Sequence, residues 1–417
     1  MHPSLEIEGS ASKRLRGKRV VLALTGSVAL VKGFEICREL MRRGAQVQVV
    51  MSEAAQKLVS AEMMHYASGR KPITEITGRV EHVEWFGKKG KGDLLLIAPA
   101  TANTISKIAL GIDDTPVTTF ATTAIGSGKP VILVPAMHES MYNHAVVKKN
   151  LKTLARRGVL VMEPLVQEGK AKLAGVGDIV LEGERALLRC GTCRGRRGKR
   201  AGSRVKGTLE GAKVVVSAGT TYESIDPVRV IATRASGKTG LEIAREAYRR
   251  GAEVTLLHNH NSAEAGIKQV TFSSAREMKN ALMKELKGAD YFVSSAAVGD
   301  FTIAGKGSKE KIKSGSALTL ALKPNEKIIS GVRKKFPKLF IAGFKAETNK
   351  TKNQMLAICS GFMRTNGLQM VVGNDIARGG MGTETNSVVI VRQNAKPVRV
   401  SGKKEKIAEK IVLQMAR

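Results

Sequence analysis

Cysteine, aromatic residues and long apolar runs are all scarce in this sequence of 417 residues. Its four cysteines are too few for the disulfide framework of a small secreted domain, and they favour a reducing compartment. No uninterrupted apolar segment approaches the ~20 residues that a membrane-spanning helix needs. The N-terminus also lacks an apolar stretch before Val20, which argues against a secretory signal peptide. We therefore expect a cytoplasmic protein that does not span a membrane.

Acidic residues are few as well: 36 Asp and Glu stand against 69 Lys and Arg, which gives a formal net charge of +33. Such a charge suits nucleic-acid binding, because Lys and Arg release counterions from phosphates. The basic residues are dispersed through amphipathic segments, however, and aromatic residues make up only 4%, too few for a surface on which bases stack. The composition therefore favours a basic surface that attracts anionic small molecules over specific recognition of nucleic acid.

An α/β pattern is present in both halves of the chain. In the first half, strands are predicted at residues 20–24, 46–51, 94–98, 131–134 and 159–162. A helix that ends near Gly44 follows the first of these strands. In the second half, a helix at 240–250 precedes predicted strands at residues 253–257, 289–294, 339–342, 370–372 and 387–391. Helices between consecutive strands indicate parallel pairing, so we predict two α/β domains with mostly parallel sheets.

The segment at 189–207 separates the two patterns. It is rich in Arg, Lys and Gly and lacks acidic residues and hydrophobic periodicity, so we predict a flexible basic linker. The domains on either side then cover residues 1–188 and 208–417. Cys190 and Cys193 form a single C-x-x-C pair, whereas a structural zinc ion needs about four ligands. An incidental thiol pair is therefore the preferred interpretation, with zinc as the alternative.

The turns that follow the strands of the first half are rich in small and hydroxyl residues. The G-x-G-x-x-G fingerprint is absent, which argues against a nicotinamide dinucleotide site. Backbone N–H groups at strand-to-helix turns bind anions, and open α/β sheets hold their ligands at the carboxyl ends of the strands. The candidate binding residues at these turns are Gly26, Ser27, Ser52, Thr101, Asn103 and Thr104.

Five motifs follow one another within residues 18–185: TGSVALVK, MSEAA, EHVEW, APATANTISKIALG and VPAMHESMY. In this combination the segment resembles the flavin-containing cysteine decarboxylases, in particular the phosphopantothenoylcysteine decarboxylase half of the coenzyme A biosynthesis bifunctional proteins. The resemblance implies a flavodoxin-like, Rossmann-like fold that binds FMN at the turns described above. A carboxylate leaves as carbon dioxide only when an electron sink is available, and by resemblance FMN creates that sink by oxidising the substrate thiol to a thioaldehyde.

The same resemblance implies catalytic residues, with two departures from the family pattern. His82 stands at the position of the family's active-site histidine and is expected to act as an acid or base. The family motif Pro-Ala-Met-Asn ends here in His138, which is expected to hold the substrate carboxylate. The flap after Glu163 lacks the family's cysteine, and Lys172 falls at or near that position. Lys172 is a possible proton donor, and the identity of the donor stays open.

The second half carries its own ordered motifs: VSAGTTYESIDPVRVIATRASGKTG, SSAAVGDF, EKIKSG, AGFKAET and VVGND. Residues 208–415 resemble the phosphopantothenate–cysteine ligases. The resemblance implies a Rossmann-like fold that activates 4'-phosphopantothenate with CTP as an acyl-cytidylate and then joins it to the amine of cysteine. The phosphates of both substrates call for positive charge and for Mg²⁺, whose ligands the sequence does not identify.

Several residues of the second half are candidates for its binding site. Ser236, Gly237 and Lys238 stand at the start of a predicted helix, where a phosphate fits. By resemblance, the other candidates are Thr233, Asp300, Lys311, Lys313, Pro324, Asn325, Glu326, Lys327 and Phe344. Thr233 replaces an asparagine that holds the acyl intermediate in many relatives. Gly361 and Thr365 stand near positions where bacterial relatives carry lysines that bind the triphosphate, so the choice between CTP and ATP stays open.

Together these features predict a bifunctional enzyme of coenzyme A biosynthesis that uses 4'-phosphopantothenate, cysteine and CTP. The resemblance implies a homo-oligomer, with trimers of the first half and dimers of the second that close into a dodecamer. Two alternatives remain at this point. One is a non-catalytic, flavin-binding regulatory protein, and the other is a first half that acts like a flavin prenyltransferase.

Overall fold

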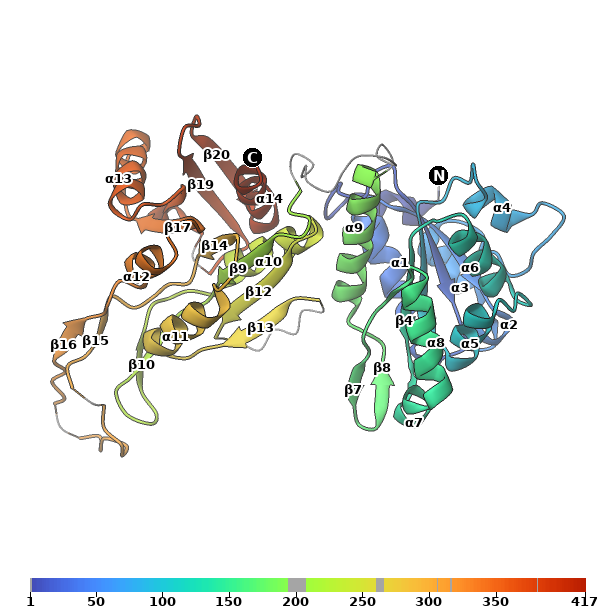
Figure 1. Ribbon diagram of the computed structural model, residues 1–417, viewed down its shortest axis with the longest axis horizontal. Helices are drawn as coiled ribbons and strands as arrows, with labels where there is room; N and C mark the ends of the chain where they lie inside the picture. Colours follow the sequence, from blue (N-terminus) through green and yellow to red (C-terminus); the bar gives the residue numbers. More distant parts are fainter. Residues whose placement is uncertain (1, 194–207, 260–265, 306, 316, 381) are drawn as a thin grey trace. The chain divides into compact units, whose positions relative to one another are not determined.

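The computed structural model describes residues 2–193, 208–259, 266–305, 307–315, 317–380 and 382–417. The chain divides into two compact units, Met1–Lys199 and Arg200–Arg417, and each unit is built around its own sheet (Figure 1). Among the helices of the described residues, none is both long and apolar enough to cross a membrane.

The sheet of the first unit consists of parallel strands in the order β2–β1–β3–β4–β6. The strands are β1 (Arg19–Leu24), β2 (Gln46–Met51), β3 (Leu94–Ala100), β4 (Val131–Pro135) and β6 (Leu160–Val161). Almost every residue of β1, β2, β3 and β4 is buried, as expected for a parallel sheet that is covered on both faces.

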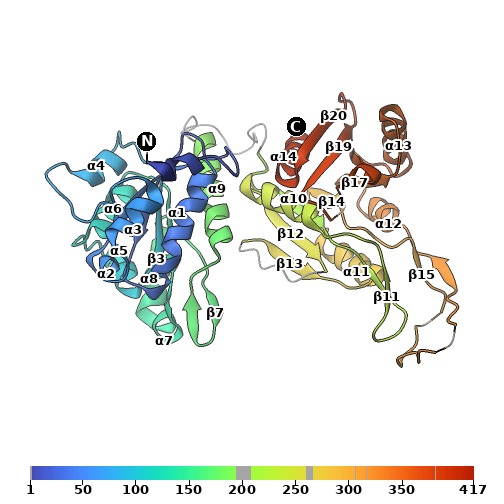
Figure 2. The ribbon, with the colours of Figure 1, turned by 180° about the vertical axis from the view of Figure 1, so that it is seen from behind.

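Helices cover both faces of this sheet. One layer contains α1 (Gly33–Arg42), α3 (Ala61–Ser68) and α9 (Val176–Cys193), of which α1 and α9 lie side by side (Figures 1 and 2). The other contains α4 (Glu81–Phe86), α5 (Ala102–Leu110), α6 (Pro116–Gly126) and α8 (Ala145–Arg156), whose apolar residues form one core with β1 and β3. The short elements are η1 (Pro3–Ile7), η2 (Val28–Lys32), α2 (Glu53–Gln56) and α7 (Glu139–Asn143).

Local signals in the sequence fix where these helices begin and end. Helix α5 shows both ends clearly: the hydroxyl of Thr101 accepts a hydrogen bond from the N–H of Thr104, and Gly111 ends the helix at φ 76°. Capping of a free N–H and a left-handed glycine are the common start and stop of an α-helix. The start of α5 is thus placed directly at the carboxyl end of β3.

A three-stranded antiparallel sheet forms a flap over the carboxyl end of the first sheet. Its strands are β5 (Met137–His138), β7 (Leu165–Gln167) and β8 (Lys170–Lys172), in the order β5–β8–β7. The turn between β7 and β8 consists of Glu168 and Gly169, which both have positive φ. Two such residues match the right-handed twist of a tight hairpin. The register then sets His138 opposite Lys170.

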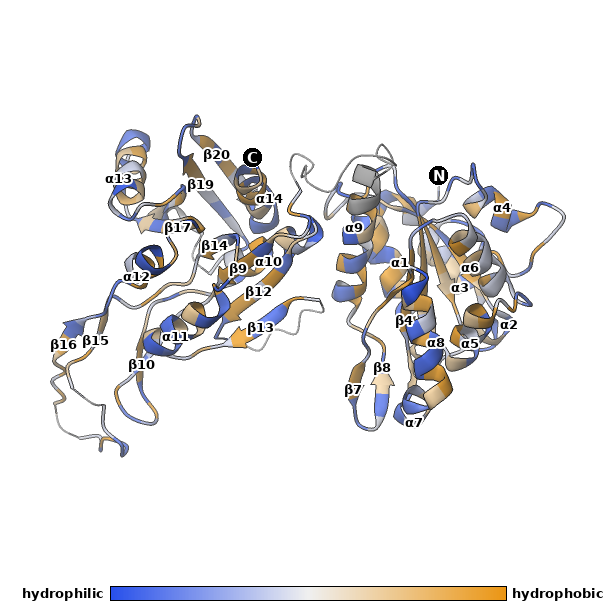
Figure 3. Ribbon diagram, viewed as in Figure 1, coloured by the Kyte–Doolittle hydropathy of each residue, from blue (hydrophilic) through white to orange (hydrophobic). Residues whose placement is uncertain are grey.

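The second sheet is longer, with the order β13–β12–β9–β14–β17–β18–β19–β20. Its parallel strands are β9 (Lys213–Ser217), β12 (Glu253–His258), β13 (Lys268–Thr271), β14 (Tyr291–Ser294), β17 (Phe340–Glu347) and β18 (Met370–Asp375). Two antiparallel strands, β19 (Thr385–Arg392) and β20 (Val398–Lys403), extend one edge. Figure 3 shows apolar residues concentrated on the strands, while the helices carry both polar and apolar residues.

Helices cover the second sheet in the same way. One layer is formed by α10 (Lys238–Arg249) and α14 (Lys404–Met415), which pack along each other. The opposite layer is formed by α11 (Ala275–Glu285), α12 (Ile328–Lys335) and α13 (Lys352–Thr365), whose apolar residues make up the other core. A short helix, η3 (Ile376–Arg378), follows β18.

Two hairpin arms project from the second unit (Figure 1). One pairs β10 (Tyr222–Ser224) with β11 (Val230–Ala232), and the other pairs β15 (Phe301–Ile303) with β16 (Leu322–Pro324). Both arms carry large apolar side chains that are about half exposed or more: Val228, Val230, Phe301, Leu318 and Leu322. The two arms are therefore less well packed than the sheet and its helices.

The predicted fold class, two α/β units with mostly parallel sheets, is confirmed. The strands and helices predicted from apolar segments occur with ends shifted by a few residues. The exposed arms and the edge strands β13 and β20 have no counterpart in the prediction, because short or half-polar strands give a weak pattern. Helix α9 continues through residues 189–193 of the predicted linker, and residues 194–207 lie outside the described part.

Candidate active sites

Both units have a pocket at the point where the strand order of the sheet reverses. In the first unit β1 lies between β2 and β3, and in the second β9 lies between β12 and β14. The loops that leave two such neighbouring strands run to opposite faces of the sheet and leave a crevice at the carboxyl ends. Both pockets occupy this crevice.

The pocket of the first unit has a volume of about 450 Å³. It lies between the turns after β1, β3 and β4 on one side and the flap on the other. The lining residues are Gly26, Ser27, Val28, Ala29, Thr101, Ala102, Ala136, Met137, His138, Met141, Lys170, Ala171, Lys172 and Leu173. The predicted residues Gly26, Ser27, Thr101, His138 and Lys172 therefore come together in one pocket.

Hydrogen bonds tie the turns of this pocket to one another. The Thr25 hydroxyl donates to the Pro99 carbonyl at 2.8 Å and accepts from the Thr101 N–H at 3.1 Å. The Ser27 hydroxyl donates to the Ala136 carbonyl at 3.3 Å. A Cβ atom at Gly26 would lie 2.6 Å from that of Ala54, so this position has no space for a larger residue. The binding turns after β1, β3 and β4 thus form a single cross-linked surface.

Three predicted cofactor residues lie outside the lining of this pocket. The Ser52 hydroxyl caps α2 by accepting from the N–H of Ala55 at 3.2 Å. The Thr104 hydroxyl is buried and lies 3.1 Å from that of Thr101. Asn103 is exposed on the first turn of α5. Ser52 and Thr104 hold the turns in shape.

The flap contributes positive charge. The Lys172 ammonium lies 2.7 Å from the Glu168 carboxylate of the same hairpin, and this contact lowers the pKa of Glu168. Lys170, which the sequence did not single out, lines the pocket beside Lys172 and pairs with His138 across the flap sheet. A carboxylate that enters this pocket meets two lysines and an imidazole.

His82 lies apart from these residues. It is on α4, between the sheet and the surface, and is not among the residues that line the pocket. Its Nδ1 atom is buried and has no hydrogen-bond partner among the described residues. A buried polar atom of this kind usually has a partner.

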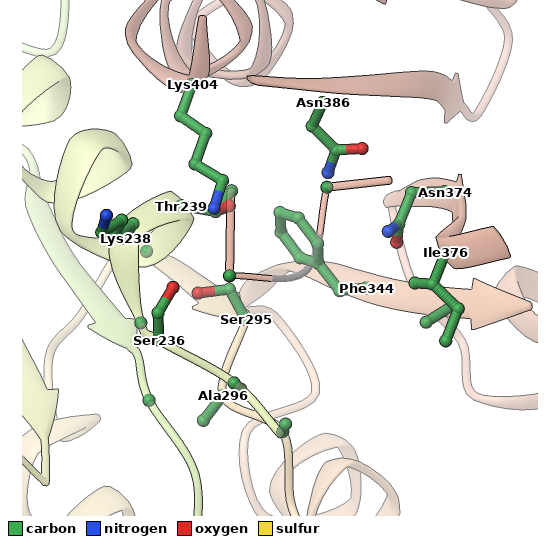
Figure 4. Close-up of a pocket in the computed structure, with 18 residues that line it drawn as sticks. Ser236, Lys238, Thr239, Ser295, Ala296, Phe344, Asn374, Ile376, Asn386 and Lys404 are labelled. Atoms are coloured by element: carbon green, nitrogen blue, oxygen red, sulfur yellow. The ribbon is translucent and has the colours of Figure 1, made fainter. Parts of the chain in front are cut away.

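The pocket of the second unit has a volume of about 180 Å³ (Figure 4). Its walls come from the turns after β9, β14, β17 and β18 and from the starts of α10 and α14. The lining residues are Gly219, Ala235, Ser236, Gly237, Lys238, Thr239, Gly240, Ser295, Ala296, Ala297, Phe344, Ala346, Asn374, Ile376, Gly380, Gly382, Asn386 and Lys404. Four predicted residues, Ser236, Gly237, Lys238 and Phe344, thus line one pocket.

The turn before α10 is shaped for an anion. Gly237 precedes the helix at φ 70°, and a Cβ atom there would lie 3.0 Å from the Gly219 nitrogen. No side chain of the described residues caps α10, so its first N–H groups stay available at the positive end of the helix. Lys238 forms an ion pair with Glu384, which lowers the pKa of Glu384.

Thr233 lies beside this pocket rather than in it. Its hydroxyl is 2.9 Å from the Thr220 hydroxyl and donates to the Ala297 carbonyl at 3.0 Å. Because Ala297 lines the pocket, Thr233 lies at its edge.

Asp300 and residues 324–327 form a separate cluster where the β15–β16 arm leaves the unit. Lys327 pairs with Asp300 at 2.6 Å, and the Asn325 amide donates to the Gly299 carbonyl at 2.9 Å. Pro324 pairs with Phe301 in the arm, and Glu326 forms an ion pair with Lys279. The cluster lies outside the lining of the described pocket.

Lys311 and Lys313 are held by a loop rather than by the pocket. The residue between them, Ile312, donates its N–H to Asp226 and accepts from Arg229. Asp226 is buried and also pairs with Arg229 at 2.6 Å. This anchor fixes the backbone of the segment and leaves both lysine side chains largely exposed.

Sequence reasoning missed several residues that line the pockets, above all Lys170, Asn386 and Lys404. Asn374 lies within the motif VVGND, which gave a usable signal. Lys170, Asn386 and Lys404 reach their pockets through hairpin register or helix packing, and a local motif does not reveal such contacts. Among the described residues, no group of three or more His, Cys, Asp or Glu side chains could hold a metal ion.

Comparison with known proteins agrees with this geometry. The Flavoprotein family matches residues 8–184, and the family described as the DNA/pantothenate metabolism flavoprotein C-terminal domain matches residues 209–417. The coenzyme A biosynthesis bifunctional protein CoaBC of Thermococcus kodakarensis is 42% identical over 416 residues, which cover 99% of this chain and 98% of the relative. The protein of the same name from Methanocaldococcus jannaschii is 33% identical over 414 residues, which cover 99% and 96%.

A solved structure of the C-terminal domain of such a protein covers 51% of this chain and 97% of its own, with 24% identity and a TM-score of 0.43. The family matches to both halves and the full-length relatives confirm the resemblance that the motifs suggested. The chain belongs to the family of coenzyme A biosynthesis bifunctional proteins, in which a flavoprotein decarboxylase and a ligase share one polypeptide.

Proposed function

We propose that the second unit makes 4'-phosphopantothenoylcysteine from 4'-phosphopantothenate, cysteine and CTP, and that the first unit decarboxylates it to 4'-phosphopantetheine with FMN. One observation carries this proposal: a single chain holds two pockets of different character, one apolar with cations at its flap and one at a helix N-terminus. The two alternatives, a regulatory flavin-binding protein and a prenyltransferase-like enzyme, are less well supported, because full-length relatives are coenzyme A biosynthesis proteins.

The first pocket fits FMN. Its lining is mostly small or apolar, with Gly26, Ala29, Ala102 and Ala136 close to the sheet, which suits a flat aromatic ring. Hydroxyl groups and backbone N–H groups at the turns offer hydrogen bonds to its polar edge and phosphate. FMN, when bound, supplies the two-electron oxidation that turns the substrate thiol into an electron sink.

The residues of the first pocket then handle charge and protons. The His138 imidazole donates a hydrogen bond to the substrate carboxylate and holds it at the mouth of the pocket. Lys172, held by Glu168, gives the proton that the product needs after carbon dioxide leaves, while Lys170 adds positive charge beside it. His82 acts as acid or base at a site that a neighbouring subunit shares.

The residues of the second pocket bind the nucleotide. Ser236, Gly237 and the first N–H groups of α10 hold phosphate oxygens, and Phe344 packs against the base. We infer that Mg²⁺, when bound with the nucleotide, takes most of its ligands from phosphates and water.

The ligase chemistry needs residues that come from several loops. We infer that Thr233, at the pocket edge, holds the activated acyl group, and that Asp300 with residues 324–327 contributes to the nucleotide and substrate site. Lys311 and Lys313 stabilise the negative charge that develops when the carboxylate attacks CTP. Both lysines lie outside the lining of the described pocket, so we infer that their exposed side chains, and not the anchored backbone at Ile312, reach toward the substrate.

We also propose a homo-oligomer built on trimers and dimers that reaches a dodecamer. The exposed apolar residues on the arms of the second unit suit a dimer contact, and exposed apolar residues near His82, such as Val80 and Val83, suit a contact of the first unit. The buried thiols of Cys37 and Cys359 are unpaired, which agrees with a reducing cytoplasm.

The purified full chain tests this proposal directly. With 4'-phosphopantothenate, cysteine, CTP and Mg²⁺, we expect 4'-phosphopantetheine, carbon dioxide and pyrophosphate, and mass spectrometry of a time course should show the amide first. Without CTP no product should form, whereas added 4'-phosphopantothenoylcysteine should still be decarboxylated. Parallel reactions with ATP measure the nucleotide preference. A folded, flavin-loaded protein that forms no amide and releases no carbon dioxide would contradict the proposal.

A further inference from the structure

Lys404 is a buried lysine in the wall of the second pocket. It is the first residue of α14 and is only 4% exposed, whereas the neighbouring Lys238 side chain is 45% exposed. Lysine is among the residues least often buried without a partner. Within the described ranges of the chain, the Lys404 ammonium has no hydrogen bond or ion pair, and its Nζ atom is not among the fully buried atoms without a partner, so it opens onto the pocket. A structural ion pair therefore does not explain why the Lys404 side chain is buried.

The direction of the side chain supplies one. Figure 4 shows Lys404 reaching from the start of α14 across the pocket toward Thr239 and the turn at Ser236. Its backbone is fixed, because the Lys404 N–H donates to the Glu384 carbonyl at 3.0 Å. The ammonium thus lies opposite the free N–H groups of α10 and faces the same space.

Two helix N-termini add to this positive field. Helices α10 and α14 have 12 residues each and pack along each other, and no side chain of the described residues caps either of them. The N-terminus of a helix favours a negative charge and disfavours a lysine. Here Lys404 occupies the first position of α14, and Lys238 the first position of α10. Placing two lysines at two positive helix ends is unfavourable unless an anion binds between them.

The carboxylates near Lys404 have other partners: Glu405 lies 4.0 Å from Arg249, and Glu242 pairs with Arg245 at 2.6 Å. Glu384 pairs with Lys238, and its side chain is 78% exposed, at the rim rather than inside the pocket. Burial, together with repulsion from Lys238, lowers the pKa of Lys404, and Glu384 offsets this only in part. An anion that enters the pocket removes the cost of this burial, because it supplies the missing partner.

We propose that Lys404 is a phosphate-binding residue of the second site and contacts the polyphosphate of the nucleotide together with the N-terminus of α10. This inference rests on the proposed function of the second unit as a nucleotide-dependent ligase. The inference gives the role of binding the anion to a residue near the C-terminal end of the unit's sequence. Lys238 keeps Glu384 as its partner and shapes the rim.

Binding of inorganic tripolyphosphate to the full chain, measured by isothermal titration calorimetry, tests the inference without relying on catalysis. Lys404→Met keeps the length of the side chain but removes its charge, and we expect it to weaken binding about 10-fold or more, the loss of one charge-assisted hydrogen bond. Lys404→Arg keeps the charge and should restore most of the affinity. Lys403→Met is the matched control, because Lys403 is exposed and lies outside the lining of this pocket.

Thermal melts of the same variants exclude a folding artefact. Without ligand, Lys404→Met should melt at the same temperature as the parent or higher, because a buried charge is gone. Only the upward shift caused by tripolyphosphate should disappear. If Lys404→Met does not fold, Lys404→Gln is measured in the same way. Equal affinity of the parent and either neutral variant for tripolyphosphate would overturn the inference.

Titrations with CTP and with ATP separate this inference from the proposed function. If the parent and Lys404→Met bind CTP equally well, the role of Lys404 is wrong and the nucleotide site stands. If the parent binds tripolyphosphate in a Lys404-dependent way but neither nucleotide, the anion site stands and the ligase proposal is wrong. A parent protein that binds none of these ligands contradicts both.

Discussion

Gly240 lies where α10 is closest to the sheet, and its replacement by Ala gives a sharp test of how the second pocket is built. A Cβ atom at this position would lie 2.4 Å from the Ser295 hydroxyl oxygen and 2.6 Å from the Ala218 Cβ. Both contacts are too short, so α10 has to move away from β9. Overpacking of this kind costs about 1–3 kcal/mol of unfolding free energy. The movement also displaces the N–H groups that we propose to hold phosphate.

Gly361 is the matched control, because it also lies within a helix, in α13. No atom of the described residues lies within 4 Å of a Cβ atom built there. Replacing it with Ala should stabilise the protein by up to about 1 kcal/mol, since Ala favours a helix over Gly. The two variants should therefore differ by about 1–4 kcal/mol in unfolding free energy.

Urea denaturation followed by circular dichroism measures this difference, and calorimetric titration with CTP measures binding. We expect Gly240→Ala to unfold at lower urea than the parent and to bind CTP more weakly, while Gly361→Ala keeps the affinity of the parent. Decarboxylation of added 4'-phosphopantothenoylcysteine should be unchanged in both variants. A Gly240→Ala protein that is as stable as Gly361→Ala and binds CTP like the parent would refute the close packing inferred here.

Three further predictions concern single side chains. His82→Asn should abolish carbon dioxide release and spare ligation, because the two sites lie in separate units; quantifying both products from one folded variant checks this. Burial opposes ionisation of Asp226, but backbone N–H groups and the Arg229 guanidinium outweigh it and lower its pKa to about 2. The stabilisation by Asp226 is complete above the ordinary pKa of an aspartate and is lost as pH falls through about 2. Asp226→Asn should therefore melt at a lower temperature than the parent at neutral pH, and the difference between their melting temperatures should become smaller in acid. Burial raises the pKa of Cys37 to about 12 and that of Cys359 to about 11. Both thiols should therefore resist iodoacetamide in the folded protein at mildly alkaline pH and react after denaturation, which peptide mass spectrometry can detect.

Much of the fold could be predicted because parallel strands that are covered on both faces consist of consecutive apolar residues, which are easily recognised in a sequence. β1, β3 and β9 are of this kind, and the turns after them could be located from the same runs. Gly26 and Thr101 were found in this way, since they stand directly where a strand ends, whereas Ser236 was found from the start of a predicted helix. Their shared position at the carboxyl edge follows from parallel pairing alone.

Other residues could not be assigned a place because their position depends on contacts between distant segments. Lys170 reaches its pocket through the register of a hairpin whose strands are only three residues long. Lys404 is one of 69 basic residues, and only the packing of α14 along α10 distinguishes it from those on the surface. The place of Thr104, predicted to contact the cofactor, depends in the same way on packing: its hydroxyl lies 3.1 Å from that of Thr101, a residue that lines the pocket.

The second pocket also bears on the order in which the second unit folds. Its phosphate-binding turn precedes α10, whereas Lys404 follows the last strand of the sheet, so nearly the whole unit separates the two in sequence. Contacts with such a large separation form late, because a long loop has to close before they are made. The pocket is therefore completed only when β20 has paired and α14 has docked. A bound nucleotide should slow unfolding more than it speeds folding, because it binds the completed pocket, which is not yet formed in the transition state.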